Sequence, residues 1–256
     1  KNISIVVQDV GIGGLCDLIS ERAEKGVQTV KEYIEAGAKA PVPKIYKDMY
    51  EAFNDPEVEV VLNLTRPYEH YGVTKAALEH GKHVFSEKPL AADMEEGTKL
   101  MALAKDKNLL MGGAPDTFMG AGIQTARKVI DYGLIGDVSG ATCEMIQHGP
   151  ETWHPDPDVL YKRGGGRMMD MGPYYVTALV QLIGEAVGVT AVTKKSFKER
   201  LITSEPHYGE KIDVDIDTHL TGSIAFANGA VAQICTTFDV HYAPGAQCRF
   251  ELYGTK

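Results

Sequence analysis

The sequence has few cysteines, and their spacing does not match that of a disulfide framework or a metal site. Its 256 residues include only four, Cys16, Cys143, Cys235 and Cys248, and no two of them form a CxxC pair. Such wide spacing argues against a disulfide framework and against a cysteine zinc site, because both need thiols at short, regular intervals. It is typical of reduced thiols, and we therefore expect a cytoplasmic protein.

Long apolar runs and an excess of positive charge are also missing. No run approaches the roughly 20 residues of a membrane span, and the start KNISIVVQ lacks the layout of a signal peptide. The 26 Lys and Arg residues are outnumbered by 35 Asp and Glu residues, which gives a net charge of −9. Because such a chain does not attract nucleic acid or anionic membranes, we expect a small-molecule partner, no nucleic acid and no membrane.

A regular alternation of helix and strand patterns fills the first half of the chain. Ser20 is expected to cap a helix that Gly37 ends, Pro67 to open a second helix, and Asp93 a third. Apolar strand patterns lie between and after these helices, at 58–64, 83–87 and 108–113. Short connections between such elements favour right-handed crossovers. We therefore predict a doubly wound parallel sheet of Rossmann type over residues 1–115.

The pattern changes after the third of these strands. A helix with an apolar stripe at 123–130 leads into long strand patterns, and Asn228 and Gly229 stand between two of them as a hairpin turn. The last stretch, CRFELYG (248–254), alternates as well. We therefore predict a second domain of α+β type over residues 116–256, with an open mixed or antiparallel sheet and helices packed on one face.

The stretch VGIGGLCDL (10–18) admits three interpretations. In the first, ISIVV is the opening strand and Gly11 and Gly13 begin a dinucleotide fingerprint in which Cys16 replaces the third glycine. In the second, GLCDL ends the second strand and Asp17 accepts hydrogen bonds from an adenosine ribose, so that the first strand and the phosphate loop precede residue 1. In the third, GIGG is a surface turn and Asp17 a solvated strand end or helix cap. The helix pattern that follows favours the second.

A short polar motif follows the strand pattern HVFS. Glu87, Lys88 and Pro89 stand at the carboxyl end of this strand, where open α/β sheets bind ligands. Because proline stiffens the backbone just after the lysine, the ammonium can point into a cleft. A solvated surface lysine before a proline is the alternative interpretation.

A second polar group lies in KRGGGRMMDMGPYY (162–175). Three consecutive glycines permit the close approach of a ligand, and Pro173 is expected at the first position of a helix. Asp170 and Tyr174 are four residues apart, so on a helix they share one face and reach the same small molecule. In the alternative interpretation Asp170 is only a helix cap and Tyr174 a core aromatic.

The stretch WHPDPD (153–158) combines a histidine with two carboxylates. Its prolines break the ligand spacing of a metal site, and we expect no metal. Trp153 and His154 are instead interpreted as walls of a pocket, since an aromatic face and a hydrogen-bonding ring suit a sugar or polyol. Asp116 and Tyr161 are the other two residues expected to contact substrate.

Three stretches together resemble one known family. TRPYEH (65–70), ALEHGKHVFSEKPL (77–90) and GGGRMMDMGPYYVTAL (164–179), in this order and spacing, are similar to the Gfo/Idh/MocA oxidoreductases over nearly the whole chain. The resemblance implies an NAD(P)-binding Rossmann domain followed by an open-sheet α/β domain that contacts substrate and often forms the oligomer interface. It also implies that a phosphate loop precedes residue 1 and that the sheet continues beyond FELYGTK.

The resemblance assigns roles to single residues. Asp17 is expected on the adenosine ribose, where its charge would repel a 2′-phosphate, so NAD is favoured over NADP. Lys88 is expected to touch both the nicotinamide ribose and the substrate. Arg66 departs from the TPP of many members, which bears on cofactor selectivity. The expected cofactor contacts are Asp17, Arg22, Thr65, Arg66, Pro67, His70, Glu87 and Lys88.

Tyr174 stands where many polyol dehydrogenases of the family have the histidine that accepts the proton. In this it resembles the branch of glucose-fructose oxidoreductase and dihydrodiol dehydrogenase. A phenol with a pKa near ~10 is a poor base at neutral pH, and the neighbouring Lys88 is expected to lower that pKa. We therefore predict that Tyr174 exchanges the hydroxyl proton, that Lys88 tunes it and orients substrate, and that Asp170 holds a substrate hydroxyl.

These expectations describe an NAD(P)-dependent oxidoreductase that acts on a hydroxyl of a sugar, sugar derivative or polyol, as a homodimer or homotetramer joined through the second-domain sheet. Two other functions stay open. A non-catalytic NAD(P)-binding sensor or corepressor would not need the proton-transferring residues. A redox-assisted lyase or glycosidase would form product without net NADH.

Overall fold

The computed structural model describes residues 10–241 and 248–256, and the chain divides into two compact units. The first comprises the described part of Lys1–Asn63 with Gly72–Phe85 and Leu100–Gly112. The second comprises Leu64–Tyr71, Ser86–Lys99 and the described part of Gly113–Lys256. Two segments that follow strands of the first half, Leu64–Tyr71 and Ser86–Lys99, thus belong to the second unit. The domain boundary at residue 115 stays a prediction.

A short parallel pair of strands opens the first unit. Strand β1 (Gly14–Leu15) pairs with β2 (Lys44–Ile45), and helix α2 (Ser20–Glu35) lies between them in the chain and buries Ala23, Val27 and Val30. This order agrees with the interpretation in which GLCDL ends a strand before a helix; the alternative first strand, ISIVV, lies outside the described residues. The cap prediction was wrong by one position. Ile19 is the N-cap, without a side-chain hydrogen bond, and Ser20 is already helical.

A three-stranded sheet follows, with strand order β3-β4-β5. Its strands are β3 (Val60–Asn63), β4 (His83–Ser86) and β5 (Met111–Gly113), each inside a predicted stretch. Helix α3 (Met49–Asn54) precedes the sheet, and α4 (His70–Glu79) and α5 (Met94–Asp106) connect its strands, as in a parallel sheet. The Asp93 carboxylate accepts the backbone N–H of Glu96 at 2.9 Å, so this cap is confirmed.

The second unit contains a five-stranded mixed sheet in the order β12-β6-β11-β10-β7. Strands β6 and β11 pair in parallel and the other neighbours pair antiparallel. The predicted Asn228-Gly229 hairpin joins β10 to β11, with Gly229 at φ +89°, a conformation that glycine adopts readily. The strands are β6 (Val138–Ile146), β7 (Ala186–Lys194), β10 (His219–Phe226), β11 (Val231–Thr237) and β12 (Arg249–Gly254).

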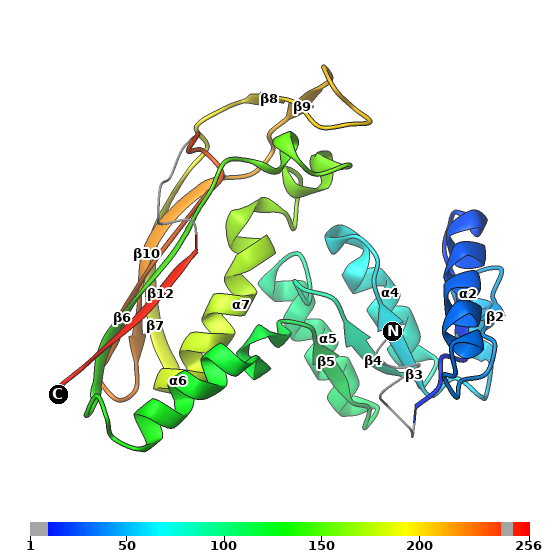
Figure 1. Cartoon of the computed structure of the whole chain (residues 1–256), viewed down its shortest axis with the longest axis horizontal. Helices are drawn as coiled ribbons and strands as arrows, with labels where there is room; N and C mark the ends of the chain where they lie inside the picture. The colour runs from blue at the N-terminus through cyan, green and yellow to red at the C-terminus, as the bar shows by residue number, and fades with distance from the viewer. Residues whose placement is uncertain (1–9, 242–247) are drawn as a thin grey trace. The chain divides into compact units, whose positions relative to one another are not determined.

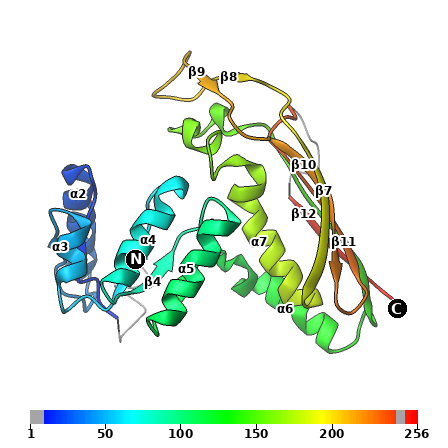
Figure 2. The same cartoon turned by 180° about the vertical axis from the view of Figure 1, so that it is seen from behind.

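Two helices cover one face of this sheet (Figures 1 and 2). Helix α6 (Ala121–Asp131) and α7 (Gly166–Ile183) pack there, and Leu179, Leu182 and Ile234 belong to the resulting core. Burial in this core raises the pKa of the Cys143 thiol to about 12.

The predicted helix start at Pro173 was wrong, since Pro173 lies inside α7. The glycine triplet starts the helix instead: Gly165 is the N-cap and Gly166 follows at φ +85°, a conformation that disfavours residues with a Cβ. Helix α7 therefore begins before Asp170, which stands in its second turn rather than at a cap.

A smaller core forms where a hairpin extends from the sheet (Figure 1). Strands β8 (Glu199–Leu201) and β9 (Lys211–Asp213) pair antiparallel, and Ile202, Ile212 and Phe238 pack with Tyr161. Four short 3-10 helices complete the described fold: η1 (Pro67–Glu69), η2 (Asp116–Met119), η3 (Pro150–Thr152) and η4 (Pro157–Leu160). Among the described residues, no helix is long and apolar enough to cross a membrane, and all four thiols are free.

Candidate active site

A lysine, a carboxylate and a phenol meet in the second unit. The Lys88 Nζ atom lies 2.6 Å from Asp170 Oδ1 and 5.6 Å from the centre of the Tyr174 ring. Lys88 follows β4, and α7 presents Asp170 and Tyr174 one turn apart, as their spacing predicts. Both ionic side chains are 19% exposed, so the pair is sheltered yet open to a small molecule.

A second cation stands beside this group and escaped the sequence reasoning. Arg167 Nη1 lies 4.0 Å from Asp170 Oδ2, and the guanidinium carbon lies 5.6 Å from the centre of the Phe238 ring. The Arg167 side chain is only 5% exposed. Asp170 is thus held between two positive charges, which fixes its carboxylate as an acceptor. The sequence did contain one signal for this contact: Arg167 stands three residues before Asp170 in GGGRMMD, a spacing that brings two side chains together on a helix.

The pKa of Tyr174 is raised above the usual value of 10. Burial is the larger cause, because it disfavours the charged phenolate, and the charge of Lys88 acts in the opposite direction without overcoming it. The expected lowering by Lys88 is therefore present but outweighed. Carboxylates add to the rise, among them Glu87 and Asp116. At neutral pH the Tyr174 side chain is a neutral phenol.

The glycine triplet that precedes α7 approaches other chain segments closely. A Cβ on Gly164 would lie 3.1 Å from that of Pro67, and one on Gly165 would lie 2.7 Å from the Leu160 carbonyl carbon. Close packing against other parts of the chain therefore accounts for two of the three glycines, by a side chain at Gly164 and by the backbone at Gly165. The sequence had suggested room for a ligand there.

The TRPYEH segment is tied to the EKP motif by a buried histidine. The ring nitrogens of His70 lie 2.6 Å from the carbonyl oxygen of Pro89 and 2.9 Å from that of Thr65. Both segments belong to the second unit, so this ring joins the backbone that carries Thr65 to the backbone that carries Lys88. Glu87 adds a local contact, since its carboxylate accepts the Lys88 backbone N–H at 3.0 Å.

Arg66 has protein partners that the sequence did not suggest. Its guanidinium donates to the Tyr68 hydroxyl at 2.9 Å and to the Asp156 carboxylate at 2.7 Å. Asp156 belongs to the WHPDPD stretch, where Trp153 is exposed and contacts the His154 ring edge to face, with ring centres 5.4 Å apart. Their role as pocket walls stays a prediction.

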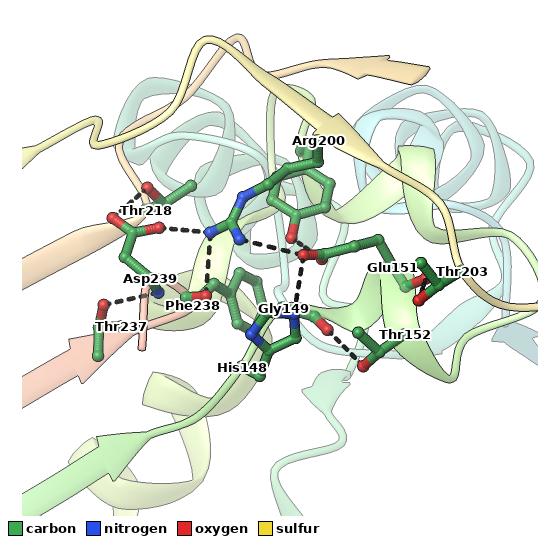
Figure 3. Close-up of polar contacts among 11 residues, drawn as sticks. His148, Gly149, Glu151, Thr152, Arg200, Thr203, Thr218, Thr237, Phe238 and Asp239 are labelled. Atoms are coloured by element: carbon green, nitrogen blue, oxygen red, sulfur yellow. Dashed lines mark hydrogen bonds and ion pairs between the residues drawn. The ribbon is translucent and has the colours of Figure 1, made fainter. Parts of the chain in front are cut away.

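Tyr161 differs from the other three residues expected to contact substrate. It is fully buried, and its hydroxyl donates to the Glu151 carboxylate. That carboxylate also accepts from Arg200 at 3.0 Å, and the Arg200 guanidinium donates in turn to Asp239 at 2.7 Å, as Figure 3 shows. The structure thus uses the Tyr161 hydroxyl inside a charged network. No short-range sequence signal pointed to that network, since its members lie 10 to 88 residues from Glu151.

The expected ribose contact, Asp17, belongs to the first unit. It follows β1, where its carboxylate accepts the Ile19 backbone N–H at 2.8 Å and lies 4.0 Å from the Arg22 guanidinium. An acceptor carboxylate at the carboxyl end of a parallel strand suits a ribose diol. Within the described ranges no group of three or more His, Cys, Asp or Glu side chains could hold a metal ion.

Family models match both halves of the chain. Residues 9–113 match an oxidoreductase family described as having an NAD-binding Rossmann fold, GFO_IDH_MocA, and residues 123–256 match the GFO/IDH/MocA C-terminal domain. The predicted fold class, a Rossmann domain followed by an α/β domain with a mixed sheet, is confirmed by these matches and by solved structures.

Several curated relatives are named as dehydrogenases. A levoglucosan dehydrogenase of Pseudarthrobacter phenanthrenivorans is 29% identical, and the match covers 82% of this chain and 56% of the relative's length. The NADP-dependent scyllo-inositol 2-dehydrogenase IolW of Bacillus subtilis is 27% identical, and the match covers 70% of this chain and 49% of the relative's length. A structure of levoglucosan dehydrogenase with NADH and levoglucosan superposes with a TM-score of 0.78 and 26% identity, over 96% of this chain and 62% of the other. The chain thus spans about half the length of the curated relatives.

Proposed function

The chain belongs to the GFO/IDH/MocA oxidoreductase family, and on that premise we propose that it catalyses NAD(P)-dependent hydride transfer between nicotinamide and a hydroxyl of a sugar, sugar derivative or polyol. The observation that carries this proposal is the meeting of Lys88, Asp170 and Tyr174, with the lysine 2.6 Å from the carboxylate and over the phenol ring. A polyhydroxylated substrate matches this set of one donor, one acceptor and one proton-exchanging group.

The side chains divide the work on the substrate. Asp170 accepts a hydrogen bond from one substrate hydroxyl, and Lys88 donates to the reacting oxygen and stabilises negative charge that develops there. Tyr174 exchanges the proton of the same oxygen. In the reduction direction the neutral phenol donates this proton, and in the oxidation direction the phenolate accepts it. Nicotinamide, when bound, supplies or takes the hydride.

The residues present suit a dinucleotide cofactor at two places. Asp17 offers a carboxylate for the ribose diol, and we propose NAD over NADP because that charge would repel a 2′-phosphate. Thr65, Pro67, His70 and Glu87 are proposed to lie along the cofactor, as the motifs of the family imply. Replacing Asp17 by Ser, with Arg22 kept, should weaken NAD binding and move the preference toward NADP, as measured by cofactor titration.

A panel assay tests the proposal. The full-length protein is incubated with NAD or NADP and with sugars, polyols and their oxidised forms, while reduced nicotinamide is followed by absorbance. We expect turnover with one substrate class, and its loss by about 100- to 10,000-fold in Tyr174→Phe with cofactor affinity unchanged. Tyr175→Phe is the matched control, because it removes the neighbouring hydroxyl on the same helix.

Other outcomes would reject the proposal in favour of a named rival. Silence across the panel, together with measured cofactor binding, would indicate a sensor or corepressor. Product without net NADH would indicate a redox-assisted lyase or glycosidase. Equal rates in Tyr174→Phe and in the wild type would remove Tyr174 from the mechanism.

We also propose a homo-oligomer joined through the sheet of the second unit. Strand β7 lies at the edge of this sheet, and Val192, paired with Thr221, is exposed on the face opposite the buried Ile224. Exposed apolar side chains of this kind mark protein interfaces. Light scattering should give a dimer or tetramer for the wild type, and Val192→Lys should dissociate it. A monomeric wild type would contradict this.

A further inference from the structure

The His154 ring is fixed in orientation by its own loop. Its Nδ1 atom lies 2.9 Å from the backbone nitrogen of Asp156, which can only donate a hydrogen bond, so Nδ1 accepts. In the neutral ring the hydrogen must then be on Nε2. No other described residue receives a hydrogen bond from Nε2, so this donor is available to a ligand.

The backbone on either side of His154 is held as well. The Ser204 hydroxyl donates to the His154 carbonyl oxygen at 2.7 Å, and the backbone N–H groups of Thr203 and Ser204 donate to the carbonyl oxygen of Glu151. Glu151 itself is anchored in the buried network of Arg200 (Figure 3). The amino-terminal side of the WHPDPD stretch is therefore rigid.

On the carboxyl-terminal side of His154, the Asp156 carboxylate connects the stretch to the TRPYEH segment. The Asp156 carboxylate is bound by Arg66 at 2.7 Å, and the other arm of the same guanidinium donates to Tyr68 at 2.9 Å. Two arms that engage two partners orient the planar fork, which a lysine could not reproduce. The contact links residues 90 positions apart and joins the TRPYEH segment to the stretch that carries His154.

We propose that Arg66 is a positioning residue for substrate binding rather than a cofactor contact: it latches Asp156, and the latched loop presents His154 as an Nε2–H donor to a substrate hydroxyl. Two features of this geometry carry the proposal, the fixed acceptor role of Nδ1 and the engagement of both arms of the guanidinium. The role toward substrate rests on the proposed function, whereas the latch itself does not.

The expected effect on affinity is modest. Arg66 and Asp156 are both partly exposed, at 49% and 44%, and water screens such pairs. We therefore expect Arg66→Met and Asp156→Asn each to raise the KM for the sugar or polyol roughly two- to fivefold, with kcat and cofactor affinity unchanged. Because both variants break the same contact, the double variant should be no worse than either single one.

A measurement on the ring tests the latch without any turnover. Long-range 1H–15N correlation spectra of the histidine rings, with His154 assigned by comparison with His154→Gln, should show a hydrogen on Nε2 alone in the wild type. In Arg66→Met the two tautomers should mix. A wild-type ring with its hydrogen on Nδ1, or an identical spectrum in the variant, would overturn the latch.

Kinetics then test its role toward substrate, with circular dichroism to establish that each variant is folded. Lys99→Ala is the matched control, since it breaks another exposed ion pair, with Glu95, on α5. A weaker cofactor affinity in Arg66→Met, but not in Asp156→Asn, would overturn the proposal and return Arg66 to the cofactor. An unchanged substrate KM in both would also overturn it. If no substrate is turned over, the proposed function and the substrate role fail together, and the ring spectra alone decide the latch.

Discussion

Two regions of the second unit contain the same three chemical groups, a cation, a carboxylate and a tyrosine. In one, Lys88 pairs with Asp170 and lies 5.6 Å from the Tyr174 ring centre. In the other, Arg200 pairs with Glu151 and lies 5.8 Å from the Tyr161 ring centre. The chemistry is alike, so any difference in role must come from the surroundings.

The surroundings differ in water access and in the use of the phenol. Lys88 and Asp170 are each 19% exposed, whereas Arg200 and Glu151 are 6% and 4% exposed. The Tyr161 hydroxyl is bound to Glu151, but the Tyr174 hydroxyl has no hydrogen bond to another described residue. A closed network stabilises a fold, and an open one can act on a ligand. The comparison teaches that burial and hydrogen bonding, not residue type, separate the two roles.

Removing the cation should affect turnover in one region and stability in the other. Under the proposed mechanism, Lys88→Met should lower kcat/KM by about 100- to 1000-fold, because the variant would lose the positive charge at the reacting oxygen. Its melting temperature should stay close to that of the wild type. Steady-state kinetics and calorimetry on the same samples measure both quantities, and a large loss of stability with intact kinetics would invert the assignment.

Arg200→Met should instead destabilise the fold. The variant leaves Glu151 and Asp239 buried without their cation, a change that costs about 3–5 kcal/mol in the free energy of unfolding. Denaturant titration measures this, and Lys99→Met, at the exposed ion pair with Glu95, is the control expected to unfold like the wild type. Equal stability of the two variants would show that the network does not support the fold.

Tyr161→Phe tests the phenol of the closed network. The variant keeps the ring but leaves a Glu151 oxygen without its donor, and we expect a loss of about 1–3 kcal/mol in unfolding free energy. Burial raises the pKa of Tyr161 far above its usual value, so its hydroxyl should stay neutral throughout the pH range of the assay. Turnover per folded molecule that fell as far as in Tyr174→Phe would erase the distinction between the two tyrosines.

The pH dependence of turnover should sharpen the comparison further. Because burial raises the pKa of Tyr174, the phenolate that accepts a proton is scarce at neutral pH and increases about tenfold per pH unit below that pKa. The kcat/KM for oxidation should therefore rise with pH from 7 to 9, while the reduction direction, which uses the neutral phenol, should stay flat. Tyr174→Phe should lose the slope. A plateau already at pH 7 would show that Lys88 outweighs burial.

The sequence predicted the elements well where the signal was local. The strands at 58–64 and 83–87, the Asn228-Gly229 hairpin and the Asp93 cap each depend on a few adjacent residues, and each is present. The start of α7 was placed seven residues late, because proline was read as a helix opener while the glycines that set the backbone stand before it. Both the proline and the glycines are typical of a helix start, and the positive φ of Gly166 places the start at the glycines.

In the site too, contacts between residues close in the sequence could be predicted and contacts between distant residues could not. Asp170 and Tyr174 share a helix face because they are four residues apart, which a sequence states directly. Arg200 and Asp239 lie 49 and 88 residues from Glu151, and Arg66 lies 90 from Asp156, so no window of sequence could join them. Contacts of this kind follow from the sheet and its hairpin, which bring distant segments together.

The sequence by itself determined the order of helices and strands, the family motifs and the trio of groups at Lys88, Asp170 and Tyr174, because these follow from short-range spacing and residue chemistry. Only the tertiary structure decided which tyrosine is closed and which is open, which partner each cation takes, and whether burial or charge sets the pKa of Tyr174. The physical reason is that water access and long-range contacts belong to the folded surroundings of a residue, and those surroundings are built from segments that are distant in the chain.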